Sequence, residues 1–500
     1  MTATEPAAGA APGDISLDEF ERAARHALAW VADYLAQPER YPVLARVRPG
    51  EIRAALPPSP PERGEPLDVI LGDFERTILP GVTHWNHPGF FAYFAISSSG
   101  PGILGELLAA ALDVNGMLWK ASPSATELEQ VVLDWLRQML GLRAEAGWFG
   151  MITDTASIST MLALAAAREA AGLDVRERGM AGRADLPPLR VYCSEHAHSS
   201  VDKGAITLGF GHANVVHVPT DDAFRMRPDR LAEAIAGDRA RGFRPLACVA
   251  TVGTTSTTSV DPVPAVADVC AREGVWLHVD GAYGGVAAIL PELRHVLDGV
   301  DRADSLVVNP HKWLFTPIDC SAFYTRHPEV LKRAFALVPE YLVTGAGDVV
   351  DYMDYGVQLG RRFRALKLWM VIRAFGVEGL AARIRHHVEL AREFAEWVAA
   401  EPGWEVAAPV PFSLVCFRYA PNGVGEVEQD VMNERVLSIV NASGRVFLSH
   451  TKLGGRYTLR LAVGNLRTER RHVADAWRLL RDAAGPGMVL TTAAPPGTGA

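Results

Sequence analysis

Between roughly residues 89 and 375, the sequence alternates short apolar runs with stretches of helical periodicity. The runs have the length of buried strands and cover residues 189–193, 214–218, 245–252, 275–279, 305–308 and 321–324. Residues 262–272, between two of these runs, have the apolar spacing of an amphipathic helix. Strands separated by such helices are the pattern of crossover connections, so the sequence predicts an α/β fold built on a mostly parallel sheet.

The remaining sequence predicts smaller parts on either side of this region. Apolar residues at helical spacing precede a proline cluster at 57–61, which is typical of a few short helices. Beyond residue 375, a long helix at 380–400 is followed by strands at 412–419, 446–449 and 457–462 and a closing helix at 469–483. We therefore predict a disordered tail (1–15), an N-terminal helical arm (16–88), a large domain (89–375), a small α+β C-terminal domain (376–483) and a second disordered tail (484–500).

Composition narrows the class of function. A chain of 500 residues that is 49% hydrophobic and 21% charged can bury a large core, which excludes a disordered or fibrous protein. Its 49 Lys and Arg against 58 Asp and Glu give a net charge of −9. Such a chain has no overall cationic field, so we expect neither a nucleic-acid nor a membrane partner and favour chemistry on a small molecule.

Cysteine usage and hydropathy bear on the compartment. The five cysteines contain no C-x-x-C pair, and an odd number cannot all pair within one chain, which favours a reducing environment. The first residues lack the pattern of a secretory signal, and no uncharged apolar run is long enough to span a membrane. We expect a cytoplasmic protein.

Lys312 is the most informative candidate for catalysis. It lies in the run Asn309-Pro310-His311-Lys312-Trp313-Leu314-Phe315, directly after the predicted strand 305–308. Apolar and aromatic neighbours partly desolvate a lysine, which lowers its pKa and frees the amine as a nucleophile. An average lysine with such flanks is instead a surface residue whose stem covers apolar neighbours, so the interpretation depends on what lies nearby.

Asp280 supplies the companion carboxylate at the end of the predicted strand 275–279. The carboxyl ends of parallel strands open on one crevice, so Asp280 and Lys312 are expected to converge. This pair fits pyridoxal 5'-phosphate, which needs a lysine for its Schiff base and an aspartate to keep its pyridine nitrogen protonated. The small residues Gly281 and Ala282 favour a flat ring against the backbone, whereas the alternative role for Asp280 is a helix N-cap.

A histidine segment at residues 194–200 follows another predicted strand. An imidazole there could stack on the cofactor ring and exchange protons with substrate. The pairs His196-x-His198 and His84-x-x-His87 are weak metal signals, because no carboxylate or cysteine completes a ligand set. We expect no metal ion.

Two segments are candidates for binding the cofactor's phosphate. Residues 153–157, Thr-Asp-Thr-Ala-Ser, open a helical stretch, and helix N-termini favour anions through their free amides and the helix dipole. Taken alone this is a common capping motif, and only the neighbouring candidates make it a phosphate site. Residues 251–255 supply further hydroxyl groups at another strand end.

Together with residues 84–94 and 122–129, these segments resemble the pyridoxal-phosphate-dependent group II decarboxylases, most closely the aromatic L-amino-acid decarboxylases. The resemblance runs in order from about residue 18 to residue 483, and the 32-residue separation of Asp280 and Lys312 matches that family. It implies a fold-type-I, aspartate aminotransferase-like architecture. It also implies a homodimer with the active site at the subunit interface and an amino acid as substrate.

By matching position, the resemblance implies a role for each cofactor residue. Lys312 looks like the Schiff-base lysine, Asp280 like the pyridinium partner and His198 like the stacking histidine. Ala282 would contact the other side of the ring, and His311 would sit beside the Schiff base. The implied phosphate and ring contacts are Thr155, Ala156, Ser157, Thr255 and Asn309.

The resemblance also bears on the product. Tyr341 lines up with the family's mobile-loop tyrosine, which protonates the carbanion left by carbon dioxide, and the glycines at 345 and 347 resemble loop hinges. Relatives that form aldehydes by oxidative deamination have Phe at this position. Tyr341 therefore favours an amine product, with the aldehyde-forming enzyme as an alternative that shares every cofactor contact.

Substrate choice depends on a different set of residues. Trp85, Tyr93 and Phe94 would offer an aromatic wall, and Gly360 matches the small residue that leaves room for an indole in plant relatives. Phenol-selective relatives have Ser there, so the sequence favours tryptophan while leaving tyrosine, phenylalanine and dihydroxyphenylalanine open. A decarboxylase of a non-aromatic amino acid remains an alternative, although no cationic pocket group for an acidic substrate can be assigned.

Some positions depart from the family pattern. Asp154 and Ile158 replace the usual glycine or serine run and a glutamate, so the Asp154 carboxylate would have to point away from a phosphate. Ala95 replaces a pocket proline, and Met117 replaces a phenylalanine that reaches across the dimer in many relatives. We include Ala95 and Met117 among the predicted substrate contacts.

The sequence disfavours two other classes of protein, a nicotinamide oxidoreductase and a non-catalytic scaffold. Residues 100–105 form a G-x-G-x-x-G, but no second strand ending in an acidic residue follows, which disfavours a nicotinamide oxidoreductase. We expect these glycines to let backbone approach the substrate carboxylate. A scaffold that had lost its chemistry would have no reason to retain Lys312, Asp280, His198 and Tyr341 together.

Overall fold

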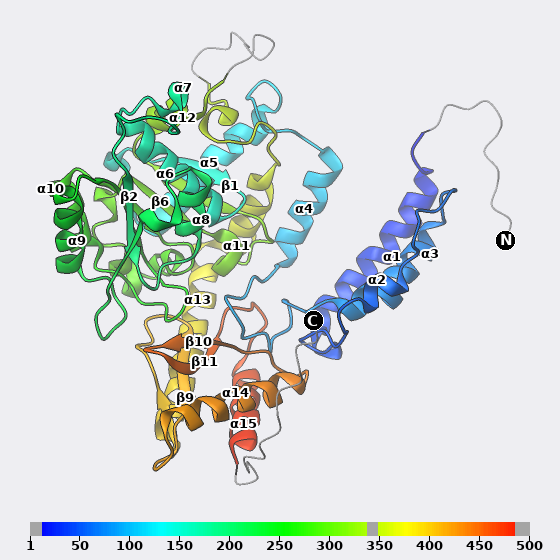
Figure 1. Cartoon of the computed structure of the whole chain (residues 1–500). Coiled ribbons are helices and arrows are strands. Elements are labelled where there is room, and N and C mark those ends of the chain that lie inside the picture. Colours follow the sequence, from blue (N-terminus) through cyan, green and yellow to red (C-terminus); the bar gives the residue numbers. More distant parts are fainter. Residues whose placement is uncertain (1–12, 338–348, 486–500) are drawn as a thin grey trace. The chain divides into compact units, whose positions relative to one another are not determined.

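The computed structural model describes residues 13–337 and 349–485, and the chain divides into two compact units, residues 1–87 and 88–500. The described part of the first unit is helical, with α1 (Leu17–Ala36), α2 (Glu51–Ala55) and α3 (Leu67–Asp73) (Figure 1). Helix α1 begins where the Ser16 hydroxyl accepts a hydrogen bond from the Glu19 backbone N–H, a typical N-cap.

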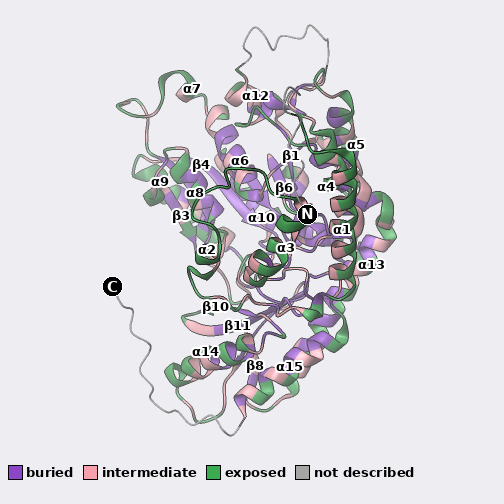
Figure 2. Cartoon of the chain, turned by 90° about the vertical axis from the view of Figure 1, so that its right-hand side faces the viewer, coloured by how far each residue is buried: buried purple, intermediate pink, exposed green. Residues whose placement is uncertain are grey.

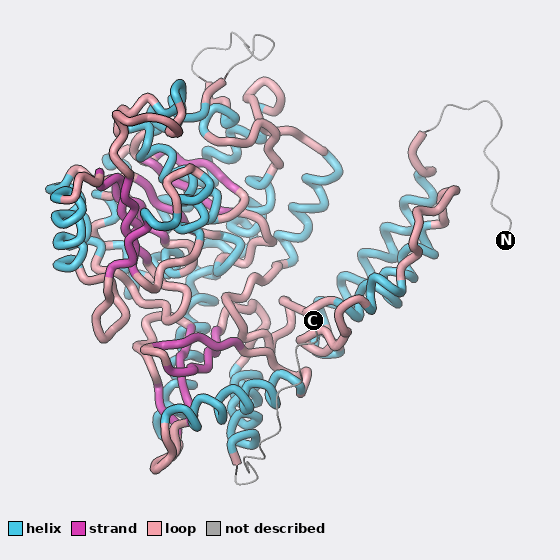
Figure 3. Tube along the Cα trace, viewed as in Figure 1, coloured by secondary structure: helices cyan, strands magenta, loops and turns pink. Residues whose placement is uncertain are grey.

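The second unit contains a seven-stranded sheet in the order β1-β7-β6-β5-β4-β2-β3. The strands are drawn in magenta in Figure 3. Strand β7 runs antiparallel to both of its neighbours, while the pairs from β6 to β3 are parallel, so the predicted mostly parallel sheet is confirmed. The strands are β1 (Phe149–Thr153), β2 (Leu189–Ser194), β3 (Val215–Val218), β4 (Arg244–Thr251), β5 (Trp276–Asp280), β6 (Ser305–Val308) and β7 (Ser321–Thr325).

Strands β2 to β7 lie within one or two residues of the predicted runs, whereas β1 was not predicted. Strand β1 lies at one edge of the sheet beside β7, and its first two residues are half-buried. A glycine, Gly150, also interrupts its apolar run. An edge strand of this composition lacks the continuous apolar signal of a central strand.

Helices cover both faces of this sheet, and neighbouring residues of β2 show the two cores. Tyr192 packs in one apolar cluster with Ile235 of α9, whereas Val191 packs in a second cluster with Leu162 of α6. The strands and the inner sides of these helices are buried, and the outer sides are exposed (Figure 2). The helices are α4 (Gly100–Leu112), α5 (Pro123–Leu140), α6 (Ala156–Ala170), α7 (Val175–Arg178), α8 (Ser200–Thr207), α9 (Pro228–Ala240), α10 (Val263–Glu273), α11 (Pro310–Trp313) and α12 (Pro328–Phe335).

A smaller sheet follows the long helix α13 (Arg364–Ala400). That helix includes the predicted one but starts earlier, with a break at Gly376, whose φ of +63° lies in the left-handed region that favours glycine. The four antiparallel strands have the order β10-β11-β9-β8, and α14 (Glu426–Ala442) and α15 (Arg470–Ala484) accompany them. The strands are β8 (Trp404–Val406), β9 (Leu414–Tyr419), β10 (Ser449–Leu453) and β11 (Arg456–Ala462).

One strand prediction in this region was wrong. Residues 446–449 were expected to form a strand, but β10 begins only at Ser449. Phe447 instead makes an isolated bridge with Phe90, far away in the sequence. No helix in the described ranges is long and apolar enough to cross a membrane.

Candidate active site

Asp280 and Lys312 come from neighbouring strands at the carboxyl edge of the large sheet. Asp280 is the last residue of β5, and it pairs in parallel register with Val307 of β6. Strand β6 ends one residue later, and Asn309 then caps the short helix α11, which carries Lys312. The sheet register therefore brings the predicted carboxylate and the predicted lysine to one edge, where ligands bind in open α/β sheets.

The surroundings of Lys312 favour a neutral amine. Burial lowers its pKa, and the negative charge of Asp280 opposes this shift only in part. Its Nζ lies 5.5 Å from the centroid of the Phe94 ring. Asp280 is 5% exposed, and its Oδ1 accepts a hydrogen bond from the Ala282 backbone N–H at 3.0 Å.

His198 lies between β2 and α8, and its ring is oriented by the chain that follows. Its Nδ1 accepts a hydrogen bond from the Ser200 backbone N–H at 3.1 Å, so the neutral imidazole carries its proton on Nε2. Burial lowers the pKa of His198; the charge of Asp280 raises it and that of Lys312 lowers it further. His198 is therefore neutral at pH 7, within electrostatic range of the other two groups.

The start of α6 has the features of an anion site. Thr155 is the N-cap, with extended backbone, and its side chain makes no capping bond to the helix. The first amides of a helix have no intrahelical acceptor, so they are available to a ligand here. Ala156, the first residue of α6, packs against Ala282 and Val307, which places this helix start beside the ends of β5 and β6. Ser157 follows on the exposed side.

The Asp154 carboxylate, one residue before that N-cap, is held by two donors. Arg364 donates to its Oδ1 at 2.5 Å, and Gln358 donates to its Oδ2 at 2.7 Å. The Arg364 side chain is 7% exposed and also donates to Asp319 at 2.9 Å. The departure noted in the sequence is thus accommodated by a buried guanidinium shared between two carboxylates.

Asn309 and His311 are fixed by buried hydrogen bonds around Lys312. The Ser321 hydroxyl donates to Asn309 Oδ1 at 2.6 Å, and the Cys320 backbone N–H donates to His311 Nδ1 at 3.0 Å. Burial lowers the pKa of His311 to about 3, so its ring stays neutral. These bonds tie α11 to strand β7 and limit the positions that Lys312 can take.

Phe94 is the outer ring of an aromatic stack that runs beside Lys312. Its ring lies 3.9 Å from the ring of Tyr283, which in turn stacks on Trp313 at 4.8 Å. Phe412 packs edge-on against Trp313, so the stack joins the large sheet to the C-terminal part of the chain. Tyr283 and Trp313 are buried, whereas Phe94 is half-buried and can present its edge to a ligand.

The other predicted substrate residues lie in separate groups. Ala95 is buried next to Gly464, and Tyr93 is 52% exposed with a φ of +53°. Met117 and Gly360 share one neighbour, Asn115: its Nδ2 donates to Met117 Sδ at 3.6 Å, and a Cβ built on Gly360 would lie 3.8 Å from that same Nδ2.

Two predicted residues cannot be joined to these groups. Trp85 belongs to the first unit of the chain. Tyr341 lies outside the described residues, together with the glycines at 345 and 347. The roles given to all of these side chains stay predictions.

Sequence reasoning gave no role to several residues around this edge. Arg460 of β11 donates to the Thr255 backbone carbonyl at 2.7 Å and lies over the Phe94 ring, while Thr255 itself is exposed. Arg361 is also buried, and it pairs with Glu129 at 2.7 Å. These pairs join residues more than 200 positions apart, so no local sequence pattern predicts them.

The glycines of residues 100–105 have a packing role. A Cβ on Gly105 would lie 2.5 Å from the Lys367 Cα, and one on Gly102 would lie 2.3 Å from the Pro317 Cδ. They allow α4 to approach α13 and the loop after α11 closely. This contact explains Gly102 and Gly105, whereas a Cβ on Gly100 would meet nothing within 4 Å. The expected approach of this backbone to the substrate carboxylate stays a prediction.

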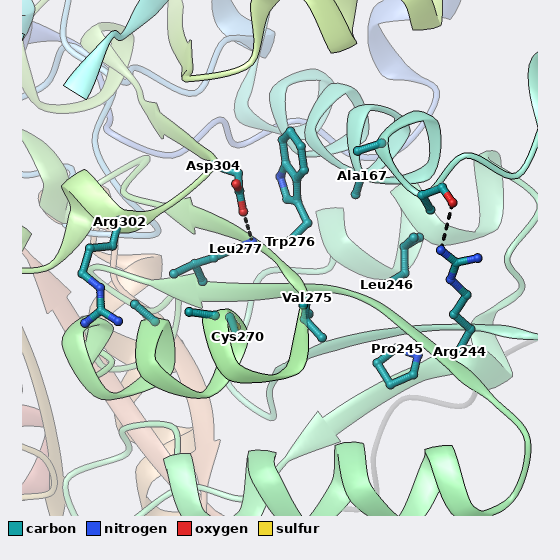
Figure 4. A pocket seen from close by; sticks show the side chains of 15 residues that line it. Ala167, Arg244, Pro245, Leu246, Cys270, Val275, Trp276, Leu277, Arg302 and Asp304 are labelled. Atoms are coloured by element: carbon teal, nitrogen blue, oxygen red, sulfur yellow. Dashed lines mark hydrogen bonds between the residues drawn. The ribbon is translucent and has the colours of Figure 1, made fainter. Parts of the chain in front are cut away.

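A cavity of about 420 Å³ opens at the opposite edge of the sheet, lined by the first residues of β4 and β5 and by α10 (Figure 4). Its charged groups are already bonded: Arg244 donates to the Ala171 carbonyl, and Asp304 accepts from the Leu277 backbone N–H. The catalytic candidates therefore lie at the carboxyl edge and not in this cavity.

Comparison with known proteins decides the family. The model of the pyridoxal-dependent decarboxylase conserved domain matches residues 49–420. The chain belongs to the pyridoxal-dependent decarboxylase family. This decarboxylase is 42% identical to tyrosine decarboxylase 4 of Petroselinum crispum and 42% identical to a phenylacetaldehyde synthase of Arabidopsis thaliana. The first match covers 93% of both chains, and the second covers 91% of this chain and 94% of the other.

A solved structure agrees with this assignment. Oryza sativa TDC, crystallised with PLP and tryptamine, superposes with a TM-score of 0.90 at 40% identity, covering 95% of this decarboxylase and 99% of that chain. The predicted resemblance, the fold-type-I architecture and the pyridoxal phosphate cofactor are thereby confirmed. The protein is a carboxy-lyase of the aromatic amino-acid decarboxylase group, which includes tryptophan and tyrosine decarboxylases and aldehyde synthases.

Proposed function

We propose that this decarboxylase converts an aromatic L-amino acid to its amine and carbon dioxide, with tryptophan as the preferred substrate. The observation that carries this proposal is the aromatic stack ending at Phe94, whose ring lies 5.5 Å from Lys312 Nζ. An aromatic ring beside the reactive amine favours an aromatic side chain over an acidic one, because ring pairs add attraction beyond the area they bury.

The residues at the sheet edge fit pyridoxal phosphate. Lys312 would hold it covalently, Asp280 would face its pyridine nitrogen, and the start of α6 at Thr155, Ala156 and Ser157 would hold its phosphate. The methyl groups of Ala156 and Ala282 already pack together there and provide a flat apolar surface. The bound cofactor supplies an electron sink for the carbanion that carbon dioxide leaves behind.

The protein's own side chains have distinct tasks in this proposal. Asp280 accepts one backbone hydrogen bond at Oδ1, which fixes its carboxylate for a cationic partner. The neutral His198 carries a proton on Nε2, and its Nδ1 bond to Ser200 holds the ring in one orientation. We assign the proton delivered to the substrate carbon to the Tyr341 hydroxyl, because relatives that make aldehydes have Phe at that position.

Tryptophan is favoured over tyrosine by the space at Gly360. Among the described residues, a built Cβ there meets only the Asn115 amide within 4 Å, which leaves room at this position. The rice relative crystallised with tryptamine supports the same preference. The remaining aromatic amino acids are secondary substrates.

The alternative activity is aldehyde formation by oxidative deamination. The phenylacetaldehyde synthase relative supports this alternative. It is 42% identical to this chain, as is the tyrosine decarboxylase relative, so overall identity does not favour either activity. Tyr341 is the residue that favours the amine. The two activities share the cofactor contacts and differ in their product.

Product analysis tests the proposal. The pyridoxal-phosphate-loaded enzyme is given tryptophan, tyrosine, phenylalanine, dihydroxyphenylalanine or glutamate separately, and amine, aldehyde and hydrogen peroxide are measured. We expect amine from the aromatic substrates, fastest from tryptophan, and none from glutamate. Aldehyde as the main product, or amine from glutamate alone, contradicts the proposal. Tyr341→Phe should divert product toward aldehyde and peroxide, and an unchanged amine yield refutes its role as proton donor.

We further propose a cytoplasmic homodimer with the active site at the interface. Helix α4 exposes the apolar side chains of Leu104, Leu107, Leu108 and Leu112, each 48–60% accessible. A second copy of the chain would cover them. All five cysteines are free and buried, as suits a reducing compartment. Light scattering should give twice the chain mass, and Leu107→Glu with Leu108→Glu should shift it toward the monomer.

A further inference from the structure

Three side chains converge on the surface beside the exposed edge of the large sheet. Asp202 lies in the first turn of α8, His212 in the short 3-10 helix His212–Asn214, and His217 on β3. Both imidazole Nε2 atoms lie 3.2 Å from the same oxygen, Asp202 Oδ1. One ligand atom from each residue lies within 4.8 Å of the other two.

These distances approach those of a tetrahedral zinc site. Ligands at about 2.0–2.2 Å from a zinc ion are separated by about 3.3 Å along each edge of the tetrahedron. The two distances from Asp202 Oδ1 to the imidazole Nε2 atoms, each 3.2 Å, are already close to this length. The third edge, between the two imidazoles, would still have to adjust. The His212 side chain is 69% exposed, so it can rotate to close that edge without disturbing the core.

The cluster also has features beyond its three ligand atoms. His217 is paired with Cys193 across the sheet, and its Nδ1 lies 3.7 Å from the Cys193 Sγ, which restrains the ring so that Nε2 faces Asp202. Glu195 supplies a second carboxylate in this region, and its Oε1 accepts hydrogen bonds from the Thr220 backbone N–H at 2.9 Å and from the Thr220 hydroxyl at 2.6 Å. The Asp202 side chain is only 19% exposed, so its charge is less screened than that of a surface carboxylate.

We propose that Asp202, His212 and His217 form a divalent transition-metal site that binds zinc. Two neutral imidazoles and one carboxylate are a ligand set that zinc accepts, with the fourth position left to water. No local sequence motif indicates this site, because nine and four residues separate its ligands along the chain and the ligands come from three different elements.

The site has a structural consequence for the catalytic edge. Asp202 belongs to the same helical turn as Ser200, whose backbone N–H orients His198. A metal bound here would cross-link α8 to β3 and hold that turn in place. The proposal does not depend on the substrate or the product.

Zinc binding is measured on the tag-free, pyridoxal-phosphate-loaded enzyme after dialysis against a chelator. Isothermal titration with zinc chloride should give one ion per chain with a Kd below about 10 μM. His217→Gln and His212→Gln should each weaken binding at least about tenfold. His450→Gln, an exposed histidine on β10, is the matched control and should bind zinc as the wild type does.

Two further readouts separate a built site from a chance surface cluster. X-ray absorption should show two imidazole nitrogens and oxygen ligands around the zinc. Zinc should raise the thermal unfolding midpoint of the wild type and of His450→Gln, but not of His217→Gln. Absence of stoichiometric binding, or equal binding by His217→Gln and wild type, overturns the proposal and leaves Asp202 as an ion-pair partner of the two histidines.

Discussion

The two halves of the proposed active site are built in different ways. The cofactor half, Thr155, His198, Asp280 and Lys312, comes from the carboxyl ends of β1, β2, β5 and β6, all strands of one sheet. The proposed substrate half includes Tyr93, Phe94, Ala95, Met117 and Gly360, which lie outside that sheet. Sheet register fixes the first set within one chain. The second set depends on loops and, in our proposal, on a second subunit.

This difference explains why charge and packing are so well defined in the cofactor half. In that half, Asp280 and His198 each accept a hydrogen bond from a buried backbone N–H, and Lys312 lies within electrostatic range of Asp280. Among the described residues of the proposed substrate half, Phe94 lies beside the cofactor half, with its ring centroid 5.5 Å from Lys312 Nζ. Changes in the cofactor half should therefore abolish chemistry, whereas changes in the substrate half should redistribute it.

The largest effect should come from Asp280→Asn in the cofactor half. The amide keeps the shape and can still accept the Ala282 hydrogen bond, but it removes the negative charge that would face the pyridine nitrogen. We expect kcat for amine formation to fall about a hundredfold or more. Cofactor content and kcat are measured together, with Asp229→Asn on the surface of α9 as the control. Wild-type turnover in Asp280→Asn contradicts the assignment.

Gly360→Ser should redistribute activity in the substrate half without abolishing it. The position has room for a side chain, so the protein should fold, but less room would remain for an indole. We expect the ratio of kcat/KM for tryptophan to that for tyrosine to fall about tenfold. Gly360→Ala separates the effect of volume from that of the hydroxyl. If both variants leave the ratio unchanged, Gly360 does not line the pocket.

A smaller change is expected at Asp154, which lies at the border of the cofactor half. Its carboxylate is bonded to Arg364 and Gln358, beside the proposed phosphate contacts. Asp154→Asn removes a like charge near the phosphate and should tighten cofactor affinity by about threefold. Gln358→Leu removes one of the two restraints on the carboxylate and should weaken affinity. Both are measured by fluorescence titration of the cofactor-free protein, and equal affinities in both variants contradict this account.

The smallest effect concerns acid stability. Burial lowers the pKa of His278 to about 4 and those of His311 and His387 to about 3, below the ordinary value of 6.5. Between the lowered pKa of each folded histidine and its ordinary value of 6.5, the unfolded chain binds more protons than the folded one. The free energy of unfolding therefore falls as the pH drops below 6.5. At pH 5.5 each histidine should lower the free energy of unfolding by about 1.4 kcal/mol.

His387→Gln tests whether stability falls with decreasing pH as predicted. Its Nδ1 accepts the Trp313 indole N–H at 3.0 Å, and a glutamine oxygen can replace that acceptor. The loss of stability between pH 7.5 and 5.5, measured by urea unfolding, should be smaller in the variant than in the wild type. Identical losses would show that His387 does not titrate on unfolding.

The sheet and its catalytic edge could be predicted because their signals are local. The strands before Asp280 and Lys312 are continuous apolar runs, and each candidate follows its strand directly. Strand β1 was missed because it is an edge strand interrupted by Gly150. The Arg364–Asp154 and Arg361–Glu129 pairs could not be predicted, because each joins positions more than 200 residues apart. The same holds for the Phe94–Tyr283–Trp313 stack, whose rings lie on three segments.

The central claim is that Lys312 holds the cofactor. Its most direct test is borohydride reduction of the pyridoxal-phosphate-loaded enzyme, followed by peptide mass spectrometry. We predict that the reduced cofactor is found on the peptide that contains Lys312, and that Lys312→Ala carries no label, while Lys332→Ala on α12 is labelled as the wild type is. A label on another lysine in the wild type, or retention of the label in Lys312→Ala, would contradict the account.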